Sequence, residues 1–86
     1  MLDMQYLQDG EGVPLHVNDH ADELLVVLEG EVSIQCGDKR VVAGPGSMIF
    51  APKGAPRSWF AVGDQVARTL KCIYPSQLDL PAAGVP

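Results

Sequence analysis

Basic clusters are missing from this sequence. Its 86 residues carry six Lys and Arg against eleven Asp and Glu, for a net charge of −5, and only Lys39 and Arg40 are adjacent. Phosphate backbones need clustered basic side chains, so the composition argues against a nucleic-acid binder. An acidic surface also disfavours docking on anionic membranes.

Long apolar runs are missing as well, and we expect no targeting signal at the N-terminus. The longest apolar run, Leu24–Leu28, has five residues, whereas a membrane helix needs about 20. The segment Met1–Tyr6 contains Asp3 and no basic region before an apolar stretch. We therefore expect a cytoplasmic protein, in which the two cysteines, Cys36 and Cys72, are reduced and buried.

Helical periodicity is absent because nine glycines and seven prolines divide the chain into short segments. These segments have the apolar runs or the alternation of strands, separated by turn residues. The pattern predicts strands at Leu2–Leu7, Leu24–Leu28, Glu31–Cys36, Arg40–Ala43, Ser47–Ala51, Arg57–Val62 and Val66–Tyr74. Short strands at close spacing predict an all-β sandwich or barrel.

The composition is that of a globular chain, with 47% hydrophobic and 20% charged residues. A chain of this length can bury one modest core, so residues 1–86 are expected to form one domain. The pattern is lost after Pro75, and we expect the tail 76–86 to be mobile.

Two spaced motifs resemble those of the cupin superfamily. The first cupin motif reads G-x5-H-x-H-x4-E-x6-G, and Gly10, His16, Asn18, Glu23 and Gly30 stand at its positions, within residues 10–30. The second reads G-x5-P-x-G-x2-H-x3-N, and its positions, within residues 46–61, hold Gly46, Pro52, Gly54, Arg57 and Ala61. The resemblance implies a small cupin-type β-barrel, a jelly-roll-like double-stranded β-helix, truncated at the N-terminus.

The departures from the motifs fall on the metal ligands. Metal-binding cupins use three His and the Glu, whereas this chain has Asn18 and Arg57 in place of two of those His. Asn18 is a weaker donor expected on the same strand face as His16. Arg57 keeps a fixed positive charge that opposes a cation. It could pair with Glu23 as a structural remnant, bind the carboxylate or phosphate of a ligand, or lie on the surface.

A pocket in the barrel is therefore the favoured site, with no metal cofactor. Its expected lining is His16, Asn18, Glu23, Arg57, Trp59, Met48 and Phe50, although Met48 and Phe50 are more typical of barrel core. The alternative is a rearranged site in which His16, His20 and Glu23 bind one divalent transition metal (Fe, Mn, Ni, Cu or Zn).

The sequence leaves three functions open. The favoured one is a small-molecule-binding cupin that takes a small polar or anionic ligand and is non-catalytic or weakly catalytic. The resemblance also allows a dioxygenase, an isomerase or a sugar-modifying enzyme with the rearranged metal site, or a metal-free enzyme with His16 as general base. The third is a non-catalytic interaction module.

A partner chain is expected for each of these three functions. A barrel short of strands exposes an edge and a flat apolar sheet face. Cupins of this size are commonly dimers, so the resemblance implies a two-fold homodimer, in which the N-terminal strands can be exchanged between the chains.

Overall fold

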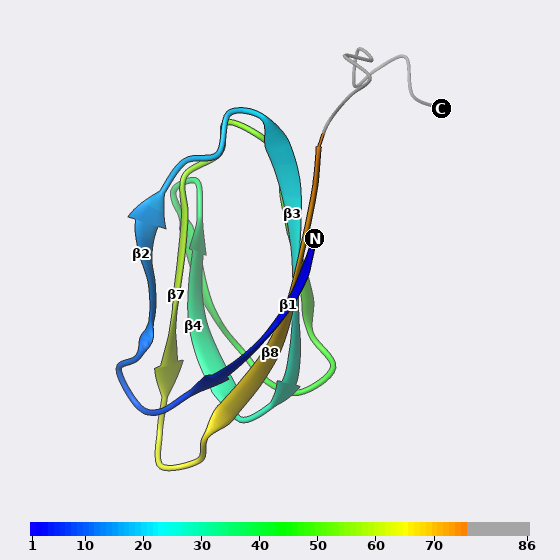
Figure 1. Cartoon of the computed structure of the whole chain (residues 1–86). Helices are drawn as coiled ribbons and strands as arrows, with labels where there is room; N and C mark the ends of the chain where they lie inside the picture. Colours follow the sequence, from blue (N-terminus) through cyan, green and yellow to red (C-terminus); the bar gives the residue numbers. More distant parts are fainter. Residues whose placement is uncertain (76–86) are drawn as a thin grey trace.

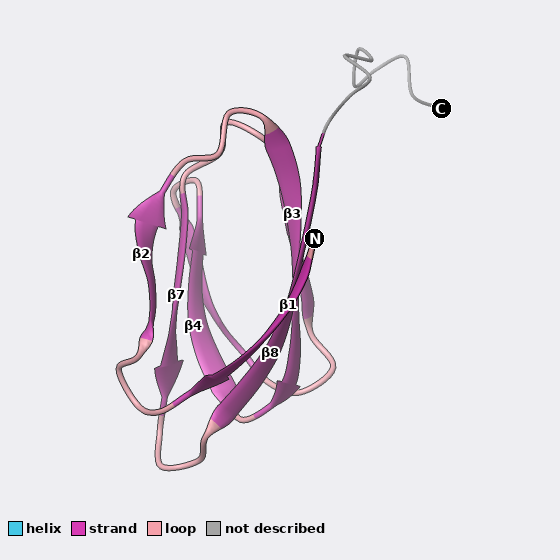
Figure 2. Ribbon diagram, viewed as in Figure 1, coloured by secondary structure: helices cyan, strands magenta, loops and turns pink. Residues whose placement is uncertain are grey.

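The computed structural model describes residues 1–75, and the expected mobile tail 76–86 lies outside the described residues. Within residues 1–75 every regular element is a β-strand, as Figures 1 and 2 show. In chain order the strands are β1 (Leu2–Leu7), β2 (Gly12–His16), β3 (Ala21–Glu29), β4 (Glu31–Cys36), β5 (Lys39–Ala43), β6 (Met48–Ala51), β7 (Arg57–Val62) and β8 (Ala67–Pro75). The described part of the chain contains no helix that is long and apolar enough to cross a membrane.

The strands form two antiparallel four-stranded sheets that face each other (Figure 1). One sheet has the order β1-β8-β3-β6 and the other the order β2-β7-β4-β5. Strands that are neighbours in the sequence often lie in different sheets, as β2 and β3 do, so both sheets are built from distant segments. This jelly-roll-like arrangement confirms the predicted fold class.

The core lies between the sheets and follows from the alternation of the strands. In β3 the odd-numbered residues from Ala21 to Val27 are buried and the even-numbered ones are half-buried. In β4, Val32 and Ile34 face Trp59 and Ala61 of β7 across the same side of the sheet. Successive side chains in a strand point to opposite faces, so the inward apolar residues of these three strands form one layer. Its members are Leu25, Val27, Val32, Ile34, Trp59 and Ala61.

Met48 and Phe50 were expected to line the pocket, but their side chains point away from the barrel interior. Met48 pairs with Val26 and Phe50 with Leu24, and directly opposed residues share a sheet face. Glu23 and Leu25 occupy the inner face of β3, so Leu24, Val26 and their partners lie on the outer face. Met48 and Phe50 are 69% and 51% exposed, and Ile49 and Ala51 face inward instead.

The two cysteines lie in different sheets, Cys36 in β4 and Cys72 in β8. Both are free thiols, as expected, but they are half-buried rather than fully buried.

Candidate functional site

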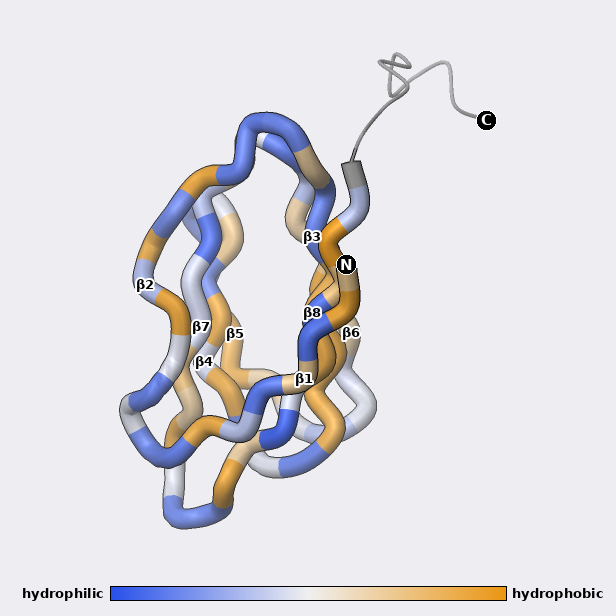
Figure 3. Tube along the Cα trace, in the orientation of Figure 1, coloured by the Kyte–Doolittle hydropathy of each residue, from blue (hydrophilic) through white to orange (hydrophobic). Residues whose placement is uncertain are grey.

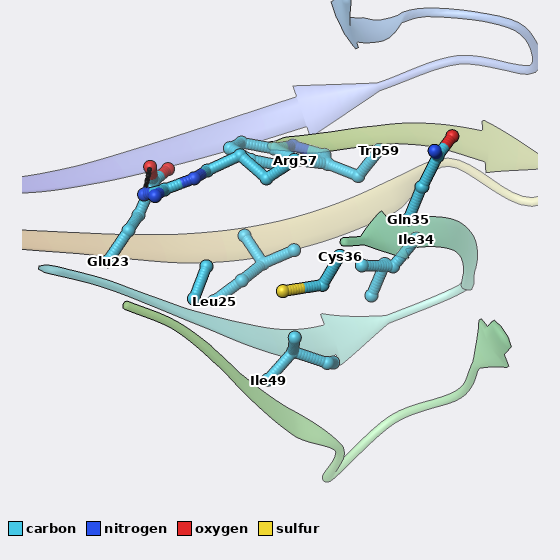
Figure 4. Close-up of a pocket in the computed structure, with 9 residues that line it drawn as sticks. Glu23, Leu25, Ile34, Gln35, Cys36, Ile49, Arg57 and Trp59 are labelled. Atoms are coloured by element: carbon cyan, nitrogen blue, oxygen red, sulfur yellow. Dashed lines mark hydrogen bonds and ion pairs between the residues drawn. The ribbon is translucent and has the colours of Figure 1, made fainter. Parts of the chain in front are cut away.

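A buried ion pair joins the two sheets inside the barrel. Arg57 begins β7 and Glu23 lies in β3, and their side chains are only 1% and 3% exposed. Arg57 Nη1 donates a hydrogen bond to Glu23 Oε1 at 3.0 Å. Figure 4 shows the two side chains meeting end to end at one end of a cavity. This is the first of the three interpretations that the sequence left open for Arg57.

The rest of the guanidinium holds the turn before β7. Arg57 Nε donates to the carbonyl of Ala55 at 3.0 Å, and Nη2 donates to the carbonyl of Pro52 at 2.8 Å. Each nitrogen of the guanidinium therefore has an acceptor within the chain. Because a buried charge is tolerated only when it is paired and hydrogen-bonded, this arrangement explains how an Arg can lie in the core of so small a barrel.

The residues present do not fit a divalent metal. A positively charged guanidinium lies against the buried Glu23 carboxylate, where a cation would have to bind. Within residues 1–75, no group of three or more His, Cys, Asp and Glu side chains could hold a metal ion. The rearranged set of His16, His20 and Glu23 is not assembled, since His20 is exposed in the loop between β2 and β3.

Asn18 has a different task from the one expected. Strand β2 ends at His16, so Asn18 lies in the following loop and not beside His16 on one strand face. Its Oδ1 accepts hydrogen bonds from the backbone amides of His20 at 2.9 Å and Ala21 at 3.1 Å. Its carbonyl accepts one from Gly54 N at 2.8 Å. Asn18 thus shapes the loop that leads into β3.

His16 lies at the edge of the ion pair. Its Nε2 is 3.8 Å from Glu23 Oε1, and its Nδ1 is 2.8 Å from the carbonyl oxygen of Pro14. Its ring stands edge-on to Trp59, with ring centroids 6.0 Å apart. The contacts with Pro14 and Trp59 fix the ring, so that one imidazole nitrogen faces the buried carboxylate.

Trp59 connects the site to the N-terminal strand. It is buried, and its Nε1 donates to Gln5 Oε1 at 3.2 Å. The ammonium of Lys71 lies 6.0 Å from the centre of the indole ring and 3.9 Å from Asp3 Oδ2. Gln5 and Lys71 were missed by the sequence analysis, because both belong to strands whose pairing with each other only the fold reveals.

A small cavity adjoins the ion pair (Figure 4). Its free space, taken as the volume open to the centre of a water-sized sphere, is about 10 Å³, close to what one ordered water requires. The lining is largely apolar and consists of Glu23, Leu25, Ile34, Gln35, Cys36, Ile49, Ala51, Arg57 and Trp59. Glu23 Oε2 is buried and has no hydrogen-bond partner within the described residues.

The structure thus brings together four of the predicted site residues, His16, Glu23, Arg57 and Trp59. It places Asn18 in a loop and Met48 and Phe50 outside. The lining residues Leu25, Ile34, Cys36 and Ile49 were not predicted, although the period of two from Glu23 to Leu25 and from Ile34 to Cys36 is the signal that could have identified them.

Comparisons with known proteins agree with this architecture. A family model described as "Cupin domain" matches residues 3–73. The solved structure of TT1209 from Thermus thermophilus is 30% identical and has a TM-score of 0.80, with 84% of this chain and 69% of that chain covered. No curated protein sequence matches the chain.

Two further solved structures are similar in fold. A predicted oxalate decarboxylase from Thermotoga maritima is 24% identical with a TM-score of 0.84, covering 87% of this chain and 65% of that one. KdgF from Halomonas sp. is 16% identical with a TM-score of 0.75, covering 92% of this chain and 70% of that one. The match to the family model and the shared fold together show that this chain belongs to the cupin-domain family.

Proposed function

We propose that this cupin binds a small polar molecule in its barrel and does so without a resident metal. The observation that carries the proposal is Glu23 Oε2, a carboxylate oxygen that is buried beside a cavity and accepts no hydrogen bond from the described residues. Leaving a buried acceptor unpaired is unfavourable by about 1–3 kcal/mol. A hydroxyl, an amino group or a water that donates to this oxygen would remove that penalty.

The cavity suggests how much of a ligand is enclosed. Its free space suits a group of about the size of one water, while Leu25, Ile34 and Ile49 offer apolar walls. We infer that one polar group of the ligand reaches Glu23 and that the remainder lies among the apolar side chains, which must move to admit it. Such a pocket, apolar with one orienting polar group, is typical of small-molecule sites.

Charge favours a neutral or hydrogen-bond-donating ligand over an anion. The guanidinium of Arg57 is already neutralised by Glu23 and also donates to two backbone carbonyls. An anion placed in the cavity would lie against the Glu23 carboxylate, which repels it. Small carboxylates and phosphates are therefore expected to bind more weakly than alcohols, polyols and amines.

The fluorescence of Trp59 provides the test, since it is the only tryptophan of the chain and lines the cavity. Purified protein would be titrated with small alcohols, polyols, amines, carboxylates and phosphates. We expect saturable emission changes with a hydrogen-bond-donating compound. The variant Ile49→Phe, which fills the cavity without touching the ion pair, should weaken that binding by about tenfold or more.

The matched control is Val42→Phe, because Val42 is exposed on β5 and does not line the cavity. It should bind the same compound as the parent does. Equal binding by Ile49→Phe, or no response to any compound, would overturn the barrel site.

Elemental analysis of protein purified without metal-affinity steps tests whether binding is independent of a metal. About one equivalent of a transition metal per chain would contradict metal-independent binding.

A further inference from the structure

Cys36 lies between two cationic residues at the end of β4. The register pairs it with Lys39 of β5 on one side and with Arg57 of β7 on the other. Directly opposed residues point to the same face of a sheet, with their Cβ atoms about 4.5–5.5 Å apart. Glu23 neutralises Arg57, whereas Lys39 is exposed. Lys39 is therefore the neighbour that gives the surroundings of the thiol a positive charge.

Cys72, the only other cysteine of the chain, has apolar neighbours instead. The register pairs it with Leu2 of β1 and Leu24 of β3, and Figure 3 shows apolar segments on the strands of this sheet. Both thiols are free and half-buried, so exposure alone does not distinguish the two cysteines. Reactive cysteines lie in electropositive, partly exposed surroundings. Of the two, Cys36 has the surroundings of a reactive thiol.

The cavity beside the ion pair gives the thiol of Cys36 room for a small reagent. Cys36 is one of its lining residues, and Figure 4 shows the sulfur directed toward Leu25 and Ile49. The free space is about 10 Å³, enough for about one water-sized oxygen. In the same lining, Glu23 Oε2 is buried and has no hydrogen-bond partner among the described residues. A small molecule with O–H donors would meet both an acceptor and a thiol in this cavity.

We propose that Cys36 is an oxidation site for hydrogen peroxide and that the added oxygen of its product, a sulfenic acid, occupies the cavity. The sulfur attacks one oxygen of the peroxide, so that an S–O bond forms and the O–O bond breaks. The thiol is oxidised by two electrons and the peroxide is reduced. The leaving hydroxide takes up the proton that the thiol loses and becomes water. The product is one oxygen larger than the thiol, which matches the space available.

No second thiol lies close enough to convert the sulfenic acid into a disulfide within the chain. Cys72 lies on the outer face of the opposite sheet, as its partner Leu24 does. Packed sheets are about 10 Å apart, which exceeds the reach of a disulfide. The oxidised state should therefore last until an external thiol condenses with it. Oxidation does not require the ligand of the proposed function, and it is measured without that ligand.

The test exposes reduced protein to hydrogen peroxide, removes the peroxide with catalase, and unfolds the protein in urea with dimedone, which traps sulfenic acids. Mass spectrometry of the peptides should show Cys36 labelled at least about tenfold faster than Cys72. Ile49→Phe, which fills the cavity, should slow labelling of Cys36 by about tenfold and leave that of Cys72 unchanged. Circular dichroism checks that this variant is folded. Labelling of Cys36 that is no faster than that of Cys72, or that folded Ile49→Phe does not slow, would overturn the proposal.

A pair of exposed variants tests the charge beside the thiol. Lys39→Gln should slow oxidation of Cys36 by about fivefold, because one charge about 4 Å away in water stabilises the negative sulfur and leaving oxygen by that factor. Arg40→Gln is the matched control, since it removes the same charge from the outer face, where Arg40 donates to Ser33 Oγ and Gln35 Oε1. It should be oxidised at the parental rate. Equal rates in the two variants would contradict the role of Lys39.

Discussion

At the scale of single residues, one side chain decides the chemistry of the barrel. Arg57 stands where the cupin motif has a metal-binding His, and its guanidinium reaches Glu23 Oε1 at 3.0 Å. The ligand that a metal would need is therefore engaged in an ion pair. Each charge of the pair stabilises the other, because either partner left alone would be a buried, uncompensated charge.

Arg57→Met should therefore destabilise the protein severely. Removing the guanidinium leaves the Glu23 carboxylate buried and frees two backbone carbonyls, and losses of about 3–5 kcal/mol are typical of a broken buried pair. The double variant Glu23→Leu/Arg57→Met should recover most of that loss, since it removes both charges. Urea unfolding of the three proteins measures this. A single variant as stable as the parent would show that the pair is not structurally important.

The site could be predicted in part, from the motif spacing for His16, Glu23 and Arg57 and from the period of two between Arg57 and Trp59. His16, Glu23, Arg57 and Trp59 were expected together and do meet. Met48 and Phe50 were placed inside because they are large and apolar, but alternation gives two faces and does not say which one is buried. The register of β6 with β3 decides it, and that register is a property of the fold.

At the scale of elements, apolar runs and alternation predicted seven of the eight strands described in residues 1–75, β1 among them. They did not give the bounds of β2 (Gly12–His16). This strand contains Gly12 and Pro14, and its pairing with β7 is irregular between Val13 and His16. The sequence therefore has no regular alternation there, and the strand exists because β7 offers it a backbone partner.

Gly12→Ala should disrupt this pairing. A Cβ at position 12 would lie 1.9 Å from the carbonyl oxygen of Trp59 and 2.7 Å from Cα of Phe60, both backbone atoms of β7. The backbones must move apart, and overpacking of this kind destabilises by about 1–3 kcal/mol. Thermal unfolding measures the loss.

Gly44→Ala is the matched control for that substitution. A Cβ there meets nothing within 4 Å, and Gly44 does not have a positive φ. The control should unfold within about 0.5 kcal/mol of the parent. If both variants were equally stable, β2 would not lie as close to β7 as the structure has it.

At the scale of the whole molecule, the pairing of distant segments is the property that the sequence pattern does not contain. β1 pairs with β8, β2 with β7, and β3 with both β6 and β8. Alternation identifies the strands but not their partners, and the cupin motifs supplied that information only through the family resemblance. Figure 1 shows the consequence, in which the N-terminal strand lies beside the last one.

This topology predicts slow folding for so small a chain. Before β1 can pair with β8, or Gln5 can accept the hydrogen bond of Trp59, segments more than 50 residues apart must meet. Closing such long loops lowers the chain entropy before the stabilising contacts can form. All-β domains of this kind therefore fold in about milliseconds to seconds. Stopped-flow dilution from urea, followed by Trp59 emission, should show recovery on that scale. Full recovery within microseconds would mean that Trp59 reaches its native surroundings through local contacts alone, contrary to the long-range pairing on which the barrel depends.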